Sequence, residues 1–390
     1  SEALEGKKYG VTIPEASFEL SKVMSRKTKI LKKLGAGIRL GLQNHGVEIV
    51  TEEARLTGKT ADGFTIAAGE SSYSARRVII ATGSKAFIPP IDGLSDVPYW
   101  TAREALEVEE LPKSIVVLGG GVIGMEFVSL FSTLGVDVTV VEMLPKILGP
   151  MDEELSTELQ QSFEKRKVKF HLSTKVTAVR DGRIIAEHEG EQLEIPFDKL
   201  LVSVGRRAVT DGLGLETVGV ELQRGAIVVD EHLETSVPGI YAVGDVNGVS
   251  MLAHTAAREG QVAVHHITDY PDAMSYRAIP GIVYTDPEIA SVGQTEQELR
   301  TAGVDYQVHR VPMSLSGRFV IENEQGNGFC KLLTDSEGVI LGAHMLGNGS
   351  SEILVPAIMA VEQRMTLTEL ARIVFPHPTV SEIVRVAALS

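Results

Sequence analysis

The run from Ile115 to Glu142 constrains the fold more than any other part of the chain. It starts in an apolar stretch of strand length and reaches Gly119, Gly121 and Gly124, which have the spacing G-x-G-x-x-G. An apolar segment of helical character follows. The next apolar stretch ends in Glu142, 18 residues after Gly124. This order of strand, glycine turn, helix, strand and acid predicts a βαβ unit with a dinucleotide site.

Each part of this run has a distinct physical role at such a site. The first glycine permits a tight turn, the second lets the backbone approach a pyrophosphate, and the third allows close packing of helix on strand. The phosphates then sit on the helix N-terminus, where unpaired N–H groups favour anions. An acid at Glu142 accepts a hydrogen bond from a ribose 2′-hydroxyl and repels a 2′-phosphate, which favours NAD over NADP. The alternative is an α/β turn without a ligand, followed by a chance acid.

Bulk properties exclude several classes of protein. A chain of 390 residues is too long for one ordinary core and suggests two or three domains. The net charge of −15 and the absence of a basic cluster argue against a nucleic-acid partner. No apolar run approaches the roughly 20 residues that span a bilayer. The single cysteine, Cys330, permits no disulfide within the chain and favours a reducing compartment, so we expect a cytoplasmic protein.

The rest of the chain gives a coarser prediction of its elements. Apolar residues at three- and four-residue spacing predict a long helix over 17–44, with Ser17 as its N-cap. We expect strands at 47–50, 63–68, 77–81 and 239–243, a Pro- and Gly-rich linker at 84–98, and a helix that starts near His254. From about Tyr276 onward, strands alternate with amphipathic helices.

Two weaker motifs lie at 240–256. A strand ends in Gly244-Asp245, where a carboxylate can bind a sugar or ribityl hydroxyl. The segment from Met251 to Ala256 then enters a helix whose N-terminus could stabilise negative charge on a reduced flavin. Taken alone, the first motif is better explained as an ordinary turn and the second as an ordinary capped helix.

The order of the motifs carries a family resemblance. The stretches are 78–84 (VIIATGS), 119–126 (GGGVIGME), 203–206 (SVGR), Gly244-Asp245 with 252–254 (LAH), and 377–382 (HPTVSE). In this order they resemble the pyridine nucleotide-disulfide oxidoreductase family over essentially the whole chain, and within it the members that oxidise dihydrolipoamide. The resemblance implies an α/β fold with FAD-binding and NAD-binding Rossmann-like domains and a C-terminal α+β dimerisation domain. The implied boundaries are 1–112 for the first part of the FAD domain, 113–235 for the NAD domain, 236–275 for the second FAD part, and 276–390 for the dimerisation domain.

The resemblance also assigns residues to the two cofactors. Around FAD it implies Asp245 at the ribityl chain, Ala253 at the flavin ring, Thr82 and Gly83 beside the cofactor, and Ala54 as a further contact. Around NAD it implies Gly119, Gly121, Val122, Ile123, Gly124, Glu142, Val176 and Gly205, and Arg206 is a further cofactor-binding candidate. Close to the flavin it implies Glu126, Leu252 and His254, with Glu126 paired to a lysine that this sequence does not contain.

His377 and Glu382 are the candidate catalytic pair. A histidine held by a carboxylate has a fixed tautomer and raised basicity, which suits a general base. Spacing alone favours a structural histidine. The resemblance favours a base that exchanges a proton with the dithiol substrate across a homodimer. The other histidines show no metal-ligand spacing, and we expect no metal site.

The chain departs from the family at one end. Relatives begin with a strand, a second G-x-G-x-x-G for FAD and a C-x4-C redox pair, and this sequence has none of these. We read Cys330 as a buried apolar residue that cannot replace the pair. Our hypothesis is that an N-terminal segment carrying these features was cleaved, disordered or assigned elsewhere.

The parent protein is then expected to oxidise protein-bound dihydrolipoamide and reduce NAD through a disulfide and FAD. Its partners would be lipoyl domains of 2-oxo acid dehydrogenase or glycine cleavage complexes, and the chain alone would be inactive. The absence of a C-terminal cysteine pair disfavours mercuric reductase, and Glu142 disfavours the NADP-dependent glutathione reductase. A soluble pyridine nucleotide transhydrogenase stays open, as does a non-catalytic fragment that binds NAD and dimerises.

Overall fold

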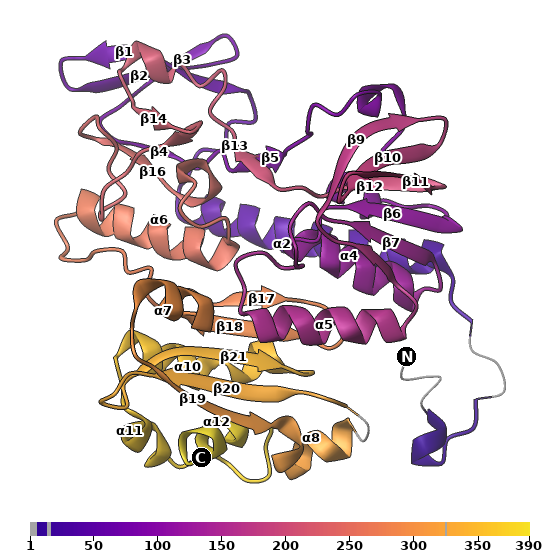
Figure 1. Ribbon diagram of the computed structural model, residues 1–390. Coiled ribbons are helices and arrows are strands. Elements are labelled where there is room, and N and C mark those ends of the chain that lie inside the picture. The colour runs from indigo at the N-terminus through magenta and orange to yellow at the C-terminus, as the bar shows by residue number, and fades with distance from the viewer. Residues whose placement is uncertain (1–5, 14–16, 324–325) are drawn as a thin grey trace. The chain divides into compact units, whose positions relative to one another are not determined.

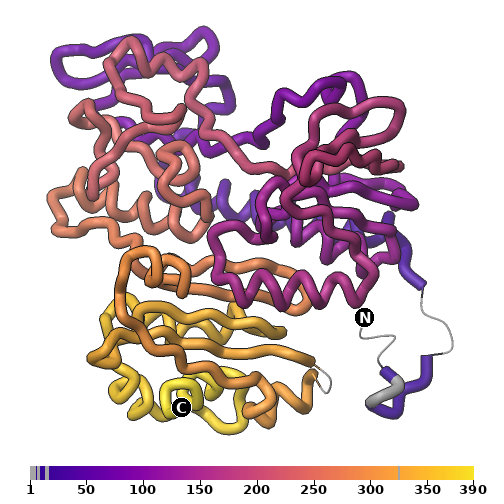
Figure 2. Tube along the Cα trace, viewed as in Figure 1, coloured from indigo at the N-terminus to yellow at the C-terminus, as the bar shows by residue number. Residues whose placement is uncertain are grey.

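The computed structural model describes residues 6–13, 17–323 and 326–390. The chain forms two compact units. The first comprises Ser1–Phe87, Leu106–Leu111 and Arg206–Met274, and the second comprises Ile88–Ala105, Pro112–Gly205 and Ser275–Ser390. Figure 2 follows the backbone along this course by residue number. The finer division into the predicted domains stays a prediction.

The first unit is built from short sheets and two long helices. A three-stranded antiparallel sheet has the order β1-β2-β3, β4 pairs in parallel with β16, and β5 pairs antiparallel with β13. The bounds are β1 Ala54–Thr60, β2 Gly63–Ala68, β3 Ser71–Ala75, β4 Val78–Ile80, β5 Ser84–Ala86, β13 Arg206–Ala208, β14 Leu222–Gln223, β15 Ala226–Ile227 and β16 Ile240–Ala242. The helices are η1 Gly6–Tyr9, α2 Leu20–Asn44, η3 Leu215–Thr217, η4 Gly244–Asn247 and α6 Ala253–Ile267.

Helix α2 confirms the helix predicted from apolar spacing, with a later start. Its N-cap is Glu19 rather than Ser17, and no side chain caps it among the described residues. None of its described residues is buried, and Leu31, Leu34 and Ile38 are 59%, 60% and 68% exposed. The period of 3.6 residues therefore specified the helix although most of its apolar stripe is exposed in the described chain.

Two other local predictions need correction. Residues 47–50 form no strand, because this apolar run finds no neighbouring strand to pair with in the described parts of the chain. The predicted linker at 84–98 contains strand β5 and the 3₁₀ helix η2, Leu94–Asp96. Proline and glycine punctuate this segment without preventing short regular elements from forming within it.

In the second unit, residues 113–205 hold the predicted βαβ unit. Four parallel strands have the order β12-β6-β7-β8, and Ile115 pairs with Val138. Figure 1 shows helix α4 against this sheet. The bounds are α3 Ala102–Ala105, β6 Ser114–Leu118, α4 Val122–Thr133, β7 Asp137–Val141, α5 Glu153–Lys165, β8 Lys169–His171, β9 Thr174–Arg180, β10 Arg183–His188, β11 Glu191–Pro196 and β12 Lys199–Val202. Strands β9 to β11 form a separate antiparallel sheet.

Residues 275–390 form an antiparallel sheet covered by helices. The strand order is β17-β18-β21-β20-β19, and α10 and α12 pack on it (Figure 1). The bounds are β17 Gly281–Val283, β18 Ile289–Gly293, α7 Glu296–Ala302, β19 Gln307–Pro312, η5 Met313–Leu315, α8 Gly317–Glu322, β20 Phe329–Thr334, β21 Ile340–Leu346, α9 Ser350–Ile353, α10 Val355–Glu362, α11 Leu367–Ala371 and α12 Glu382–Ala388. Within the described residues, no helix is both long and apolar enough to cross a membrane.

Candidate dinucleotide and flavin sites

The glycine turn between β6 and α4 has the geometry that a dinucleotide requires. Gly119 has a φ of 103°, and a Cβ there would lie 2.6 Å from the carbonyl oxygen of Ser203. A Cβ on Gly124 would lie 2.2 Å from the carbonyl oxygen of Gly119. At Gly121, in contrast, a Cβ would meet no described atom within 4 Å. The first and third glycines therefore serve the turn and its packing, whereas the second faces open space.

The N-terminus of α4 has the features of an anion-binding site. Gly121 is its N-cap, and no described side chain caps the first turn. The backbone N–H groups of Val122 and Ile123 lie in this turn, where the helix dipole favours negative charge. The residues present thus fit a bound pyrophosphate.

Glu142 lies at the end of β7 beside the glycine turn. Its Oε2 accepts a hydrogen bond from the N–H of Gly120 at 2.6 Å, and its Oε1 accepts one from the N–H of Leu144 at 2.7 Å. Each oxygen keeps a second lone pair for a further donor. The carboxylate is therefore fixed in place by backbone groups and can still accept a ribose hydroxyl.

The segment after β7 also contacts the turn, which the sequence did not reveal. The N–H of Leu148 donates to the carbonyl oxygen of Gly120 at 2.8 Å, and Ile147 Cγ2 lies 3.1 Å from the place of a Cβ on Gly120. The hydroxyl of Ser203 donates to the carbonyl oxygens of Leu118 and Gly119, each at 3.2 Å. Ser203 begins the stretch 203–206 of the family resemblance, whereas Ile147 and Leu148 belong to no motif that spacing could have identified.

Val176 and Gly205 are placed less clearly. Val176 lies in β9, buried in the core of this part of the unit, and pairs with Ala186. Gly205 follows β12 with a φ of 123° and is exposed. Their contact with a nucleotide stays a prediction.

In the first unit, Asp245 is the centre of a polar group. Its Oδ2 accepts a short hydrogen bond from the hydroxyl of Ser84, and Arg206 Nε lies 3.8 Å away. Arg206 also donates to Ser84, from Nε to Oγ at 2.7 Å and from Nη2 to the carbonyl oxygen at 2.8 Å. The structure therefore places Arg206 with the flavin candidates. Ser84 is a new member of the group.

Thr82 and Gly83 join β4 to β5 beside this group. The Thr82 hydroxyl donates to the carbonyl oxygen of Val209 at 2.7 Å, and the N–H of Val209 donates to the carbonyl oxygen of Gly83 at 2.9 Å. Ala54 is exposed at the start of β1 and pairs with Ala68. A role for Ala54 in cofactor binding stays a prediction.

The turn that carries Asp245 is fixed by hydrogen bonds to Glu259 of α6. This carboxylate, fully buried, accepts hydrogen bonds from the N–H of Gly244 at 2.5 Å and from Asn247 Nδ2 at 3.0 Å. At the start of the same helix, Leu252 is the N-cap and provides no side-chain cap. The first turn, with Ala253 and His254 exposed, thus offers a helix N-terminus to a flavin.

Glu126, in α4, accepts a hydrogen bond from a backbone group of the described chain, and its pairing with a lysine outside this sequence stays a prediction. Its Oε1 accepts a hydrogen bond from the N–H of Tyr284 at 3.0 Å. Burial raises the pKa of Glu126, and this hydrogen bond offsets only part of the effect.

His377 and Glu382 are brought together. His377 Nδ1 lies 2.8 Å from Glu382 Oε2, and the His377 side chain is 79% exposed whereas that of Glu382 is 18% exposed. Because the carboxylate only accepts, Nδ1 carries the proton and Nε2 is left as the accepting nitrogen. The pair can therefore take a proton from a group outside the described chain.

Cys330, in contrast to the exposed His377, is a buried residue. It lies in β20 with no exposed surface, and burial raises the pKa of its thiol to about 12. It cannot act as a thiolate at neutral pH. Among the described residues, only Asp152, Glu154 and Glu296 lie close enough together to resemble a metal site, and Lys331 Nζ fills the space between them.

Comparison with known proteins gives two matches to one family. Residues 5–260 match the pyridine nucleotide-disulphide oxidoreductase family, and residues 279–388 match the dimerisation domain of the same family. The chain belongs to this family. Its members bind FAD and NAD(P) and use them in disulfide oxidoreduction, and the dimerisation domain supports a homodimer.

Similar sequences and structures span nearly the whole chain. A dihydrolipoyl dehydrogenase of Cupriavidus necator is 36% identical over 98% of this chain and 82% of its own, and the mitochondrial dihydrolipoyl dehydrogenase of Rattus norvegicus is 37% identical over 98% and 77%. The crystal structure of LpdA from Mycobacterium tuberculosis matches with a TM-score of 0.87 at 28% identity, covering 96% of this chain and 84% of that one. The flavoprotein disulfide reductase RclA from Escherichia coli, with a TM-score of 0.85 at 24% identity over 95% and 86%, shares the fold.

Proposed function

We propose that this chain provides the NAD site, the second half of the flavin site and the proton-accepting pair of a dihydrolipoyl dehydrogenase. The reaction would oxidise protein-bound dihydrolipoamide to lipoamide and reduce NAD to NADH. The observation that carries the proposal is the exposed imidazole of His377, oriented by Glu382. The similarity to dihydrolipoyl dehydrogenases supports the choice of substrate.

The residues would divide the work as follows. His377 Nε2 would take a proton from the dithiol, and Glu382 would stabilise the imidazolium that forms. Glu142 would accept the ribose 2′-hydroxyl of NAD and disfavour the 2′-phosphate of NADP. When bound, FAD supplies the two-electron relay between a disulfide and the nicotinamide, and Asp245 with the N-terminus of α6 would hold it.

This reaction needs a redox disulfide, and the chain has one cysteine. The disulfide must therefore come from outside these 390 residues. A second function follows from the same fact, namely a non-catalytic module that binds NAD and dimerises. The buried thiol of Cys330 favours this alternative for the chain on its own.

A visible absorption spectrum of the purified chain separates the two functions. Bound oxidised flavin would mean that the rest of the flavin site accompanies the chain, and dihydrolipoamide should then reduce NAD. Without flavin we expect NAD binding and dimerisation without turnover. Tighter binding of NADP than of NAD would overturn the cofactor assignment. A flavin-containing preparation that reduces other disulfides but does not turn over dihydrolipoamide would overturn the substrate assignment.

A further inference from the structure

Lys331 occupies an unusual place in the second unit. It lies in β20, where all six residues are buried, and its side chain has no exposed surface. An ammonium group in such a position costs several kcal/mol unless it is paired and hydrogen-bonded. A lysine at the centre of an apolar strand therefore needs specific partners.

Its partners satisfy all three donors of the ammonium group. Nζ donates to Asp152 Oδ1 at 2.6 Å, to Glu296 Oε1 at 2.7 Å and lies 3.0 Å from Glu154 Oε2. Burial would lower the pKa of Lys331, but these carboxylates outweigh burial and raise it. The side chain is therefore charged at neutral pH and bound to the start of helix α5, 179 residues away in the sequence.

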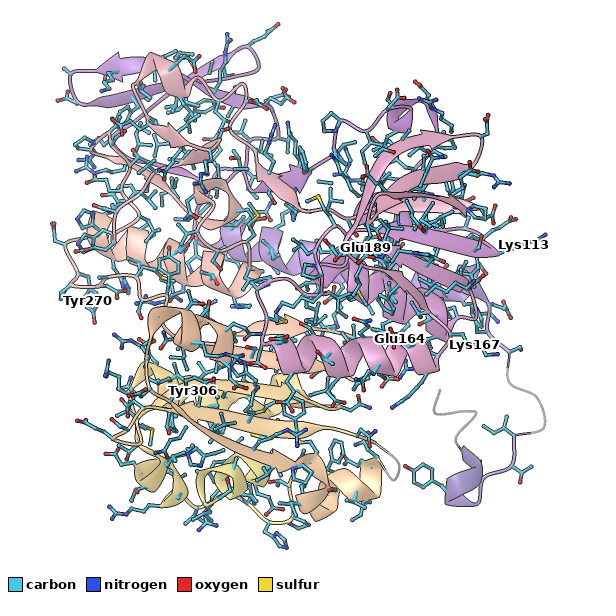
Figure 3. The ribbon with its side chains drawn as sticks, viewed as in Figure 1. Lys113, Glu164, Lys167, Glu189, Tyr270 and Tyr306 are labelled. Carbon is cyan, nitrogen blue, oxygen red and sulfur yellow. The ribbon has the colours of Figure 1, made fainter. Side chains whose placement is uncertain are left out.

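Asp152 is held from a second side as well. Its Oδ2 accepts from the N–H of Glu296, at the start of α7, at 3.3 Å. Glu296 is itself held by the hydroxyl of Tyr306, labelled in Figure 3, at 3.0 Å. Asp152 is also the N-cap of α5 and accepts from the N–H of Glu154 at 3.1 Å. This buried carboxylate, 1% exposed, is thus immobilised by groups of the C-terminal sheet and its helix α7.

Asp152 ends the segment 142–152, which contacts Gly120 in the glycine turn of the candidate dinucleotide site. This segment begins at Glu142, whose carboxylate binds the N–H of Gly120. In its middle, the N–H of Leu148 donates to the carbonyl oxygen of Gly120. Near its end, Lys146 Nζ donates to the carbonyl oxygen of Met151 at 2.7 Å. Both ends and the middle of the segment are therefore fixed, and the far end is fixed by Lys331.

We propose that Lys331 is a positioning residue for the adenosine side of the dinucleotide site. It holds Asp152, and through it residues 142–152, in the register that places Glu142 and Gly120 against the ribose and pyrophosphate. The C-terminal domain would thereby contribute to nucleotide binding without touching the nucleotide. The inference rests on the dinucleotide site of the proposed function.

The test is calorimetric titration of the purified chain with NAD, ADP-ribose and nicotinamide mononucleotide. In Lys331→Met, Asp152 loses its main donor, and the Kd for NAD and ADP-ribose should rise about tenfold or more. The Kd for nicotinamide mononucleotide should stay within about twofold, because that half of NAD does not reach Glu142. General loosening of the unit would instead raise the Kd of ADP-ribose and that of nicotinamide mononucleotide alike.

Two further variants make the test decisive. Asp152→Asn keeps a good N-cap but loses the ion pair with Lys331. It should therefore fold, and show the same rise in the Kd for NAD and ADP-ribose, even if Lys331→Met does not fold. Arg310→Met is the matched control. Arg310 lies opposite Lys331 on the neighbouring strand β19, and it binds Glu154 at 2.5 Å without touching Asp152. Its Kd values should equal those of the wild type.

The outcomes distinguish the inference from the proposed function. Wild-type protein that binds NAD, together with a folded Lys331→Met or Asp152→Asn variant of unchanged ADP-ribose affinity, would overturn the inference alone. A wild-type chain that binds neither NAD nor ADP-ribose would overturn both. Selective loss of ADP-ribose affinity in both variants, with Arg310→Met unaffected, supports the inference.

Discussion

At the scale of single residues, the glycine turn offers a matched pair of substitutions. In Gly121→Ala the new Cβ meets no described atom within 4 Å and the φ of −73° suits any L residue, so the free energy of unfolding should change by less than about 1 kcal/mol. The methyl group would nevertheless occupy the space that a pyrophosphate needs, and the Kd for NAD should rise at least about tenfold.

In Gly124→Ala the Cβ would collide with the carbonyl oxygen of Gly119, which should cost about 1–3 kcal/mol of stability as well as binding. Denaturant unfolding and NAD titration of both variants check this; equal loss of stability in the two would contradict the assigned roles.

At the scale of elements, strand β21 carries a buried histidine, His344, next to strand β18. This histidine makes the stability of the fold depend on pH. His344 Nε2 donates to the carbonyl oxygen of Gln294 at 3.0 Å, and Nδ1 lies 2.8 Å from the hydroxyl oxygen of Ser291, which donates to it when the ring is neutral. Burial lowers the pKa of His344 below its ordinary value of about 6.5. Below that ordinary value the unfolded chain binds a proton that the folded chain rejects, so stability is lost as the pH falls toward the folded-state pKa. The wild type should therefore lose unfolding free energy between pH 7 and pH 5, and His344→Gln should show a slope shallower by up to about 1.4 kcal/mol per pH unit. Coincident slopes in chemical denaturation would refute this.

At the scale of the whole molecule, the sequence predicted what is encoded locally. The turn at 119–124 and the helix α2 follow from contiguous spacing, and His377 with Glu382 from a separation of five residues. The contact of Ser84 with Asp245 and that of Lys331 with Asp152 join residues 161 and 179 positions apart. Such pairs leave no periodic signal, because only the packing of distant segments brings them together. The support of Asp245 by Glu259 was missed for a related reason, since an acid in a helix is ordinarily solvated.

The dimerisation domain leads to the last prediction, which concerns assembly. Val374, in the segment before His377, is 92% exposed in the single chain, and an apolar side chain so placed in a dimerisation domain is a candidate interface residue. A twofold dimer buries two copies of each interface residue, so Val374→Asp should raise the dimer Kd roughly a hundredfold. Because the side chain touches solvent in the monomer, the stability of the fold should change by less than about 0.5 kcal/mol. Sedimentation velocity over a concentration series measures the change, with Leu222→Asp as the control, since Leu222 is 47% exposed on β14 in the other unit. If Val374→Asp dimerises as the wild type does while folding normally, the interface excludes this segment, and His377 beside it cannot reach a partner subunit through that contact.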